Sequence, residues 1–182
     1  MKRTEETILV VDDSRVVRKT ISGGLKKAGY NVLTAENGSE GLELVKQSVP
    51  DLIISDIVMP KMDGMEFLKA LREDPKTEAI PLIFLTAMDE MDNKIMGFQA
   101  GADDYITKPV KIEELLVRVA AKLERMKFLR ERADLDGLTG LYNRRYFDEK
   151  LSEVTTYFRR YESPLSLSIM DIDHFKKVND NY

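Results

Sequence analysis

Five short runs of apolar residues, spaced through the first 108 residues, limit the folds open to this chain. They lie at Ile8–Val11, Asn31–Ala35, Leu52–Ser55, Leu82–Leu85 and Tyr105–Thr107. Short runs rich in β-branched residues are typical of strands. Because the runs are apolar nearly throughout, rather than at every second position, they indicate a parallel sheet that is covered on both faces.

The segments between these runs carry apolar residues at helical spacing. In Ser14–Ala28 the apolar positions recur at intervals of four, four and three residues, and Gly29 follows as a helix stop. Similar patterns predict helices at Ser39–Gln47, Met65–Arg72, Asp89–Ala100 and from Ile112 onward. Alternating strands and helices predict an α/β fold with a flavodoxin-like, doubly wound parallel sheet of five strands in the order 2-1-3-4-5.

The last of these helices is predicted to run past the first domain. Its apolar residues alternate at spacings of four and three from Ile112 to Met126, before Arg130 interrupts the pattern. Two interpretations stay open: a helix that packs on the sheet and then frays into a charged linker, or a signalling helix that pairs with a second copy. We place the first domain at residues 5–124, a helical linker at 125–135 and a further segment at 136–182.

Composition argues against several classes of protein. A net charge of −4 leaves no overall positive field for a nucleic-acid backbone. The longest apolar stretches are too short to span a bilayer, and the opening MKRTEET has no apolar signal-peptide core. The absence of cysteine fits a reducing compartment. We therefore expect a cytoplasmic protein with neither a nucleic-acid nor a membrane partner.

Polar residues follow the predicted strands at one edge of the sheet. Asp12 and Asp13 follow the first strand, and Asp56 follows the third. These strands are neighbours at the switch point of the fold, so the three carboxylates are expected to converge. Oxygen ligands without His or Cys suit a hard cation, Mg²⁺ above all. Thr86 and Lys108, at the ends of two other strands, would add a hydroxyl and an ammonium for phosphoryl oxygens, so the pattern predicts phosphoryl transfer.

Each of these residues also has a simpler explanation. Asp13 could cap a helix, and Asp56 could end a strand in a turn. Lys108 and Pro109 could begin a helix. Capping preferences do not place matching residues at four separate strand ends, so the joint pattern favours the phosphoryl-transfer interpretation.

The first 120 residues resemble the receiver domain of two-component response regulators. The resemblance rests on the Asp12-Asp13 pair, Asp56 within DIVMPKMDG, Thr86-Ala87, Tyr105 and Lys108-Pro109. It implies that Asp56 accepts a phosphoryl group from a sensor histidine kinase. It also implies that Asp13 and Asp56 bind Mg²⁺ directly, while Asp12 assists and the carbonyl of Val58 completes the ligands.

The same resemblance assigns roles to the remaining strand-end residues. Thr86 and Tyr105 would form the switch pair, with Thr86 turning toward the phosphoryl group and Tyr105 rotating inward behind it. Lys108 would hold the phosphoryl group by its charge. The Lys108–Pro109 peptide bond is expected to be cis.

A second pair of motifs lies beyond residue 135. DGLTGLYNRR at 136–145 and DIDHFKKVND at 171–180, with a helical stretch at Tyr146–Tyr161 and an apolar strand at Leu165–Met170 between them, resemble the first half of a GGDEF diguanylate cyclase domain. The resemblance implies a truncated α+β GGDEF segment at 136–182, in which Asp171 and the carbonyl of Ile172 bind a metal. It also implies that Asn179 reads guanine and that Phe175 and Lys176 contact the phosphates of GTP. The other interpretation is a strand-turn-helix in which Asp171 and Asp173 cap the helix and Phe175 is core.

Together the motifs imply a response regulator, phosphorylated on Asp56, that controls conversion of two GTP to cyclic di-GMP. The 182 residues contain no GGDEF turn, so this chain alone is expected to be inactive as a cyclase. A homodimer through the receiver and linker helix is expected to bring two output domains together. The alternative is a phosphorylation-dependent binding or phosphorelay receiver with an inert tail. A DNA-binding output is disfavoured, because no helix-turn-helix with a basic recognition helix follows residue 133.

Overall fold

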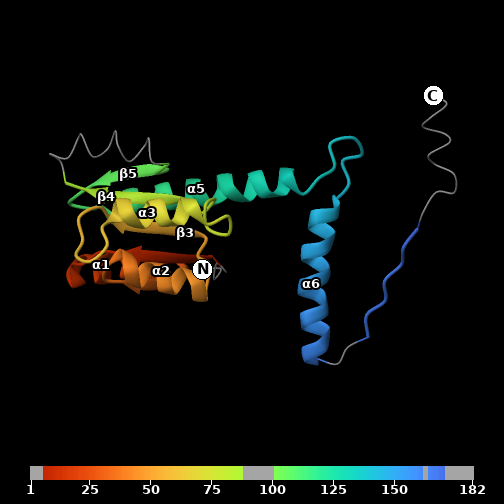
Figure 1. Ribbon diagram of the computed structural model, residues 1–182. Coiled ribbons are helices and arrows are strands. Elements are labelled where there is room, and N and C mark those ends of the chain that lie inside the picture. The colour runs from red at the N-terminus through yellow and green to blue at the C-terminus, as the bar shows by residue number, and fades with distance from the viewer. Residues whose placement is uncertain (1–5, 88–100, 162–163, 171–182) are drawn as a thin grey trace. The chain divides into compact units, whose positions relative to one another are not determined.

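The sheet has the predicted strand order. The computed structural model describes residues 6–87, 101–161 and 164–170. Within these residues, five parallel strands lie in the order β2-β1-β3-β4-β5 (Figure 1). The strands are β1 Thr7–Val11, β2 Asn31–Ala35, β3 Leu52–Asp56, β4 Leu82–Thr86 and β5 Asp104–Thr107. The prediction of a doubly wound, flavodoxin-like α/β fold is therefore confirmed.

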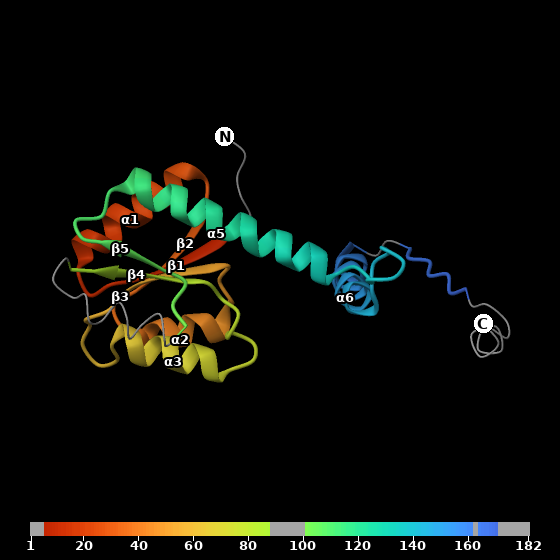
Figure 2. The same ribbon diagram turned by 90° about the horizontal axis from the view of Figure 1, so that it is seen from above.

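Helices cover both faces of this sheet (Figure 2). On one face lie α1 Arg15–Ala28 and the first part of α5 Ile112–Ala133. On the other face lie α2 Gly38–Gln47 and α3 Gly64–Glu73. The helix predicted at Asp89–Ala100 lies outside the described residues.

The central strand β1 shows why the apolar runs are continuous. Leu9 and Val11 pack on the side of α2 and α3, whereas Ile8 and Val10 pack on the side of α1 and α5. All four side chains are fully buried. Since burial stabilises the fold by about 25 cal/mol per Å² of apolar surface, both faces of the strand contribute to the core. The core thereby holds the carboxyl ends of the strands at one edge.

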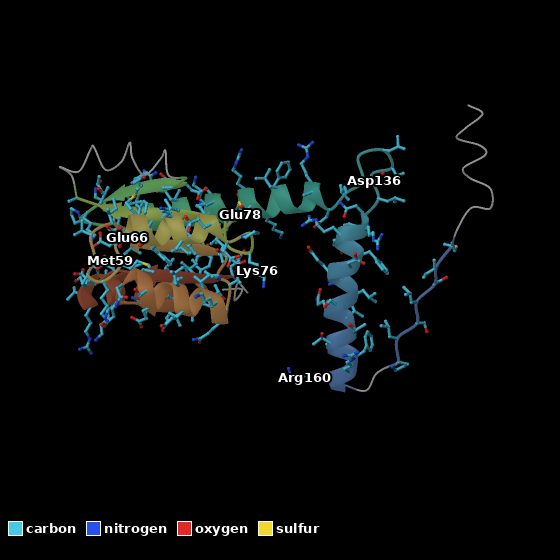
Figure 3. All side chains as sticks on the ribbon, in the orientation of Figure 1. Met59, Glu66, Lys76, Glu78, Asp136 and Arg160 are labelled. Carbon is cyan, nitrogen blue, oxygen red and sulfur yellow. The ribbon has the colours of Figure 1, made fainter. Side chains whose placement is uncertain are left out.

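Helix ends follow local signals in the sequence. Gly29 ends α1 in the left-handed conformation, with φ at 105°. Asp63 and Glu66 form a capping box at the start of α3, where Glu66 is labelled in Figure 3. Asp63 Oδ1 accepts a hydrogen bond from the Glu66 N–H at 2.8 Å, and Glu66 Oε2 accepts one from the Asp63 N–H at 3.1 Å. The box starts α3 directly after the loop that follows β3.

The first half of α5 packs on the sheet. Leu115, Val119 and Leu123 are buried in the same cluster as the α1 face. The helix continues to Ala133, so it does not fray at residues 127–132. Pairing with a second copy through its remaining turns stays a prediction. Neither α5 nor any other described helix is apolar enough over a sufficient length to cross a membrane.

Residues 129–182 form a second compact unit, after the first at 1–128. Its main described element is α6, Arg144–Tyr161. The strand predicted at Leu165–Met170 is wrong: residues 164–170 adopt no regular secondary structure, and Ile169 and Met170 are 84% and 93% exposed. A strand needs a neighbour for its N–H and C=O groups, and no described strand of this unit lies beside these residues. The finer boundaries between 124 and 136 stay predictions.

The capping box predicts the effect of a substitution at Asp63. Asp63→Ala should lower the free energy of unfolding by about 1 kcal/mol, because two N–H groups at the start of α3 lose their acceptor. Asp63→Asn keeps an acceptor oxygen and should lose less. Urea unfolding of both variants measures the difference. Equal losses in the two variants would show that the cap is not the source of the stability.

Candidate functional site

Three carboxylates meet at the carboxyl edge of the sheet. Asp12 and Asp13 follow β1, and Asp56 is the last residue of β3. One oxygen from each lies within 4.8 Å of the other two. Asp12 is fully buried and Asp56 is 9% exposed, whereas Asp13 is exposed. The cluster therefore combines two buried acids with a third acid that faces solvent.

Lys108 joins the two buried acids. It follows β5, and its Nζ donates hydrogen bonds to Asp56 Oδ2 at 2.6 Å and to Asp12 Oδ2 at 3.1 Å. The Lys108–Pro109 peptide bond is cis, as predicted. One ammonium thus contacts carboxylates that come from two other strand ends.

Burial and charge oppose one another in this group. Burial is the largest effect on Asp56 and raises the pKa of its carboxyl group, and the hydrogen bond and charge of Lys108 only partly offset this rise. Burial lowers the pKa of the Lys108 ammonium, but hydrogen bonds to Asp56 and Asp12 outweigh it, so that pKa is raised. The negative charge of Asp12 adds to the rise at Asp56. Such a cluster favours the approach of further positive charge.

The loop after β3 folds back onto Asp56. The Ile57 N–H donates to Asp56 Oδ1 at 2.8 Å, and the Gly64 N–H donates to the Ile57 carbonyl at 2.8 Å. A Cβ atom at Gly64 would lie 2.2 Å from the Asp56 carbonyl oxygen, so only glycine fits there. The glycine of the DIVMPKMDG motif therefore holds the loop close to the acid.

Arg18 is a site residue that the sequence analysis missed. Its Nη1 donates to the carbonyls of Asp12 at 2.6 Å and Asp13 at 3.0 Å, and its Nη2 pairs with Glu36 Oε1 at 2.5 Å. The guanidinium therefore braces the turn that carries two of the acids. A signal was available, because Arg18 stands three residues before Ile21 on the buried stripe of α1, where a charged residue is unusual.

Thr86 and Tyr105 lie on neighbouring strands next to this cluster. Thr86 ends β4, is fully buried, and donates through Oγ1 to the Ala87 carbonyl at 3.1 Å. The Tyr105 ring is buried against Phe84, with ring centroids 5.6 Å apart. Burial raises the pKa of the Tyr105 hydroxyl to about 12. In this structure the tyrosine is thus already directed inward.

The donor set of the cluster fits a hard divalent cation. All its side-chain ligand atoms are carboxylate oxygens. Mg²⁺ and Ca²⁺ prefer oxygen ligands, whereas zinc is commonly bound by histidine nitrogen and cysteine sulfur. Val58 lies two residues after Asp56, and the residue is 63% exposed. The part of its carbonyl as a further ligand stays a prediction.

The first motif of the second unit forms an ordered loop before α6. Asp136, which is labelled in Figure 3, closes this loop. Its Oδ1 accepts hydrogen bonds from Thr139 Oγ1 at 2.8 Å and from the Thr139 N–H at 2.9 Å. Asn143 Oδ1 accepts from the Tyr146 N–H at 3.1 Å and caps the helix. Arg145 pairs with Asp134 at 2.5 Å. These residues of the motif build the loop.

The predicted nucleotide and metal residues of the second unit lie outside the described residues. They are Asp171, Ile172, Phe175, Lys176 and Asn179. Their roles stay predictions.

The raised pKa of Asp56 predicts a pH-dependent stability. Above the folded-state pKa of Asp56, its ionised carboxylate lowers the free energy of unfolding. This loss of stability decreases as the pH falls through the folded-state pKa, and it is absent below the pKa of the unfolded chain. Without Mg²⁺, Asp56→Asn should therefore raise the free energy of unfolding at about pH 7, and the gain should shrink toward about pH 4. Urea unfolding across this range measures it, with Asp74→Asn, at an exposed acid, as the control. A gain that grew on acidification would contradict the assignment.

Comparison with known protein families identifies both parts of the chain. The response regulator receiver domain family matches residues 8–120. The diguanylate cyclase GGDEF domain family matches residues 133–182. The first match covers the sheet and the carboxylate cluster, and the second covers α6 and the loop before it.

Individual relatives agree with the first match. The DNA-binding dual master transcriptional regulator RpaA of Synechocystis is 45% identical over 118 residues, which are 65% of this chain and 49% of that protein. The response regulator MprA of Mycolicibacterium vanbaalenii is 37% identical over 161 residues, which are 88% of this chain and 66% of that protein. This chain thus spans about half to two thirds of the length of these relatives.

Solved structures agree as well. The chemotaxis response regulator CheY4 of Vibrio cholerae is 37% identical with a TM-score of 0.62, covering 65% of this chain and 99% of that one. A CheY-like response regulator receiver domain protein from Methanospirillum hungatei is 30% identical with a TM-score of 0.64, covering 68% of this chain and 98% of that one. The chain therefore belongs to the response regulator receiver family, and it carries a receiver domain followed by a GGDEF domain.

Proposed function

We propose that this protein is a two-component response regulator that is phosphorylated on Asp56 and thereby controls the formation of cyclic di-GMP from two GTP. The observation that carries the proposal is the environment of Asp56. Its carboxylate is nearly buried, lies within 4.8 Å of Asp12 and Asp13, and bonds to Lys108. A turn or cap residue would not need two further acids and a lysine from other strand ends.

Mg²⁺ is the cation that the proposal places at this cluster, as receiver domains typically bind it. Asp13 and Asp56 would bind it directly, Asp12 would assist, and the carbonyl of Val58 would complete the protein ligands. When bound, the ion would offset the negative charge between the acids and the incoming phosphoryl group.

Asp56 would act as the nucleophile toward a phosphohistidine of a sensor histidine kinase. A carboxylate oxygen attacks the phosphorus, the P–N bond breaks, and the imidazole leaves while the phosphoryl group stays on Asp56 as an acyl phosphate. Lys108 pairs with Asp56 Oδ2 before transfer and would pair with the phosphoryl oxygens afterwards. The Thr86 hydroxyl would then donate to the same group, with Tyr105 packed inward behind it.

A groove beside Lys108 supports docking of the phosphodonor kinase. It has a volume of about 170 Å³ and lies between α1 and the segment after β5. Val16, which lines it, is 73% exposed, although it is a large apolar residue. An exposed apolar groove next to the phosphoacceptor fits the contact that a donor protein must make there.

The GGDEF domain is the proposed output. Asp171 and the carbonyl of Ile172 would bind a metal, Asn179 would read guanine, and Phe175 and Lys176 would contact the phosphates of GTP. Phosphorylation would favour a homodimer through the receiver and α5, which brings two GTP-loaded output domains face to face. The family match at 133–182 and the continuous course of α5 to Ala133 support this proposal. The proposal involves neither nucleic acid nor membrane, and it places the protein in the cytoplasm.

A phosphorylation-dependent binding or phosphorelay receiver is the alternative. It shares the Asp56 chemistry and differs only in the output. The test uses this receiver joined to a GGDEF domain that includes the GGDEF turn. An increase in cyclic di-GMP in cells expressing that protein, lost with Asp56→Asn, would favour the cyclase. Phosphorylation without such an increase would favour the alternative.

Phosphorylation of Asp56 can be tested by intact mass. Acetyl phosphate with Mg²⁺ should add one phosphoryl group to the protein. Asp56→Asn should abolish the addition because it removes the attacking carboxylate. Chelation by EDTA should abolish it because it removes the cation that offsets the negative charge of the acids and the phosphoryl group. Asp74→Asn should be phosphorylated like the unchanged protein. Retained labelling of Asp56→Asn would refute the assignment of the phosphoacceptor.

Dimerisation can be tested separately by light scattering during gel filtration. Treatment with acetyl phosphate and Mg²⁺ should shift the protein from a monomer mass toward twice that mass, at concentrations where untreated protein stays monomeric. Asp56→Asn should show no shift. An unchanged mass for fully phosphorylated protein would remove the dimer from the proposed mechanism while leaving the phosphoacceptor intact.

A further inference from the structure

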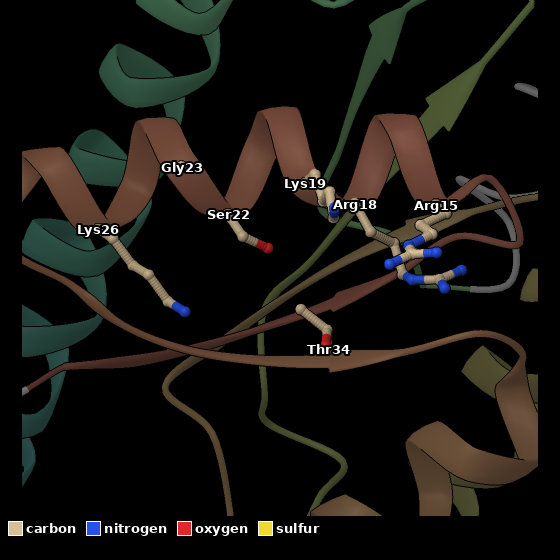
Figure 4. A pocket seen from close by; sticks show the side chains of 7 residues that line it. All are labelled: Arg15, Arg18, Lys19, Ser22, Gly23, Lys26 and Thr34. Atoms are coloured by element: carbon tan, nitrogen blue, oxygen red, sulfur yellow. The ribbon is translucent and has the colours of Figure 1, made fainter.

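A pocket lined by basic residues lies between α1 and β2 (Figure 4). Its volume is about 430 Å³, within the range of small-molecule sites. Four of its lining side chains are cationic, Arg15, Arg18, Lys19 and Lys26, and none is acidic. The chain as a whole has a net charge of −4. This local concentration of positive charge therefore favours an anionic ligand.

The spacing of these residues places them on one face of α1. Arg15, Lys19, Ser22 and Lys26 follow one another at intervals of four, three and four residues. Among them, Arg15 and Lys19 are four residues apart and carry like charges, which repel one another and destabilise a helix. An anion bound between them would remove this repulsion.

Ser22 gives the pocket a buried hydroxyl. The residue is 7% exposed, and among the described residues its Oγ has no hydrogen-bond partner. A buried hydroxyl without a partner costs free energy, so an unpaired one in a pocket indicates a ligand that would pair with it. In Figure 4 this hydroxyl points into the space between Lys26 and Thr34. Lys26 and Thr34 line the same pocket as this hydroxyl.

Arg18 adds a positive charge whose position is held by the fold. Its guanidinium is anchored by the carbonyls of Asp12 and Asp13 and by Glu36, and its side chain is only 11% exposed. Glu36 balances part of that charge. Arg15, Lys19 and Lys26 supply the positive charge that remains for a ligand.

Gly23 keeps one side of the pocket open. A glycine inside a helix is less stable than alanine there. A Cβ atom at Gly23 would meet no described atom within 4 Å, so packing does not require a glycine at this position. Its effect in the structure is to leave room at the wall of the pocket.

We propose that this pocket binds a small phosphate-bearing anion, such as pyrophosphate or a nucleotide. A phosphate group has several oxygens that accept hydrogen bonds in different directions, which matches hydroxyl, ammonium and guanidinium donors around one space. A multiply charged phosphate also matches the three cations that Glu36 leaves unbalanced. The ligand would contact Ser22, Thr34 and Lys26, with Lys19 and Arg15 completing the charge.

Calorimetric titration of the whole protein tests the proposal. Pyrophosphate and CTP are titrated separately in EDTA at constant ionic strength. EDTA prevents the carboxylate cluster from holding phosphate through a cation, and CTP lacks the guanine that the GGDEF domain is proposed to read. Ser22→Ala and Lys26→Ala should each weaken binding about tenfold, because each removes one hydrogen bond to a charged ligand. Lys27→Ala changes a neighbouring exposed lysine that does not line the pocket, and it should bind like the unchanged protein.

Thermal unfolding without ligand separates loss of the site from loss of the fold. Ser22→Ala removes an unpaired hydroxyl and should keep or raise Tm. Gly23→Ala should raise Tm, because alanine is more stable than glycine inside a helix. It should also weaken binding, because the added methyl group takes up space in the pocket. Stronger binding of CTP than of pyrophosphate would identify a nucleotide site, and equal binding would identify a site for the phosphate groups alone. Unchanged affinity in Ser22→Ala, or an equal loss in Lys27→Ala and Lys26→Ala, would overturn the proposal.

Discussion

Two buried carboxylates share one ammonium at the carboxyl edge of the sheet, and the chemistry of the site depends on this imbalance. Lys108 reaches both Asp12 and Asp56, yet burial still raises the pKa of Asp56. Removing charges from water costs free energy that a single partner does not fully restore. The folded protein therefore favours additional positive charge at this edge, which is the condition that binding a cation and a phosphoryl group requires.

Elements on both faces of the sheet hold this charge in place. From one face, the backbone of Gly64 at the start of α3 lies so close to Asp56 that no side chain fits between them. From the other face, Arg18 of α1 binds the carbonyls of Asp12 and Asp13. Since Arg18 also lines the basic pocket, one guanidinium connects the acidic turn with the anion site proposed between α1 and β2. The two sites are thus adjacent but of opposite charge.

The second unit shows how much of a motif can be explained by local structure. In DGLTGLYNRR, Asp136 closes the loop, Asn143 caps α6, and Arg145 pairs with a nearby acid. These contacts join residues close together in the sequence and do not require a complete sheet. By contrast, Tyr142 and Phe147 remain 64% and 44% exposed, because the described part of this unit offers no layer to cover them.

The sequence by itself determined the fold class, the strand order and the residues at the strand ends. Apolar runs and helical spacing are local patterns, and parallel strands bring Asp12, Asp56 and Lys108 to one edge whatever the details of packing. Only the tertiary structure decided that Arg18 braces the acidic turn, that Ser22 faces a pocket, and that residues 164–170 form no strand. The physical reason is that these outcomes depend on partners distant in the sequence. A buried polar group or a strand is defined by what lies beside it, and neighbouring residues do not specify that.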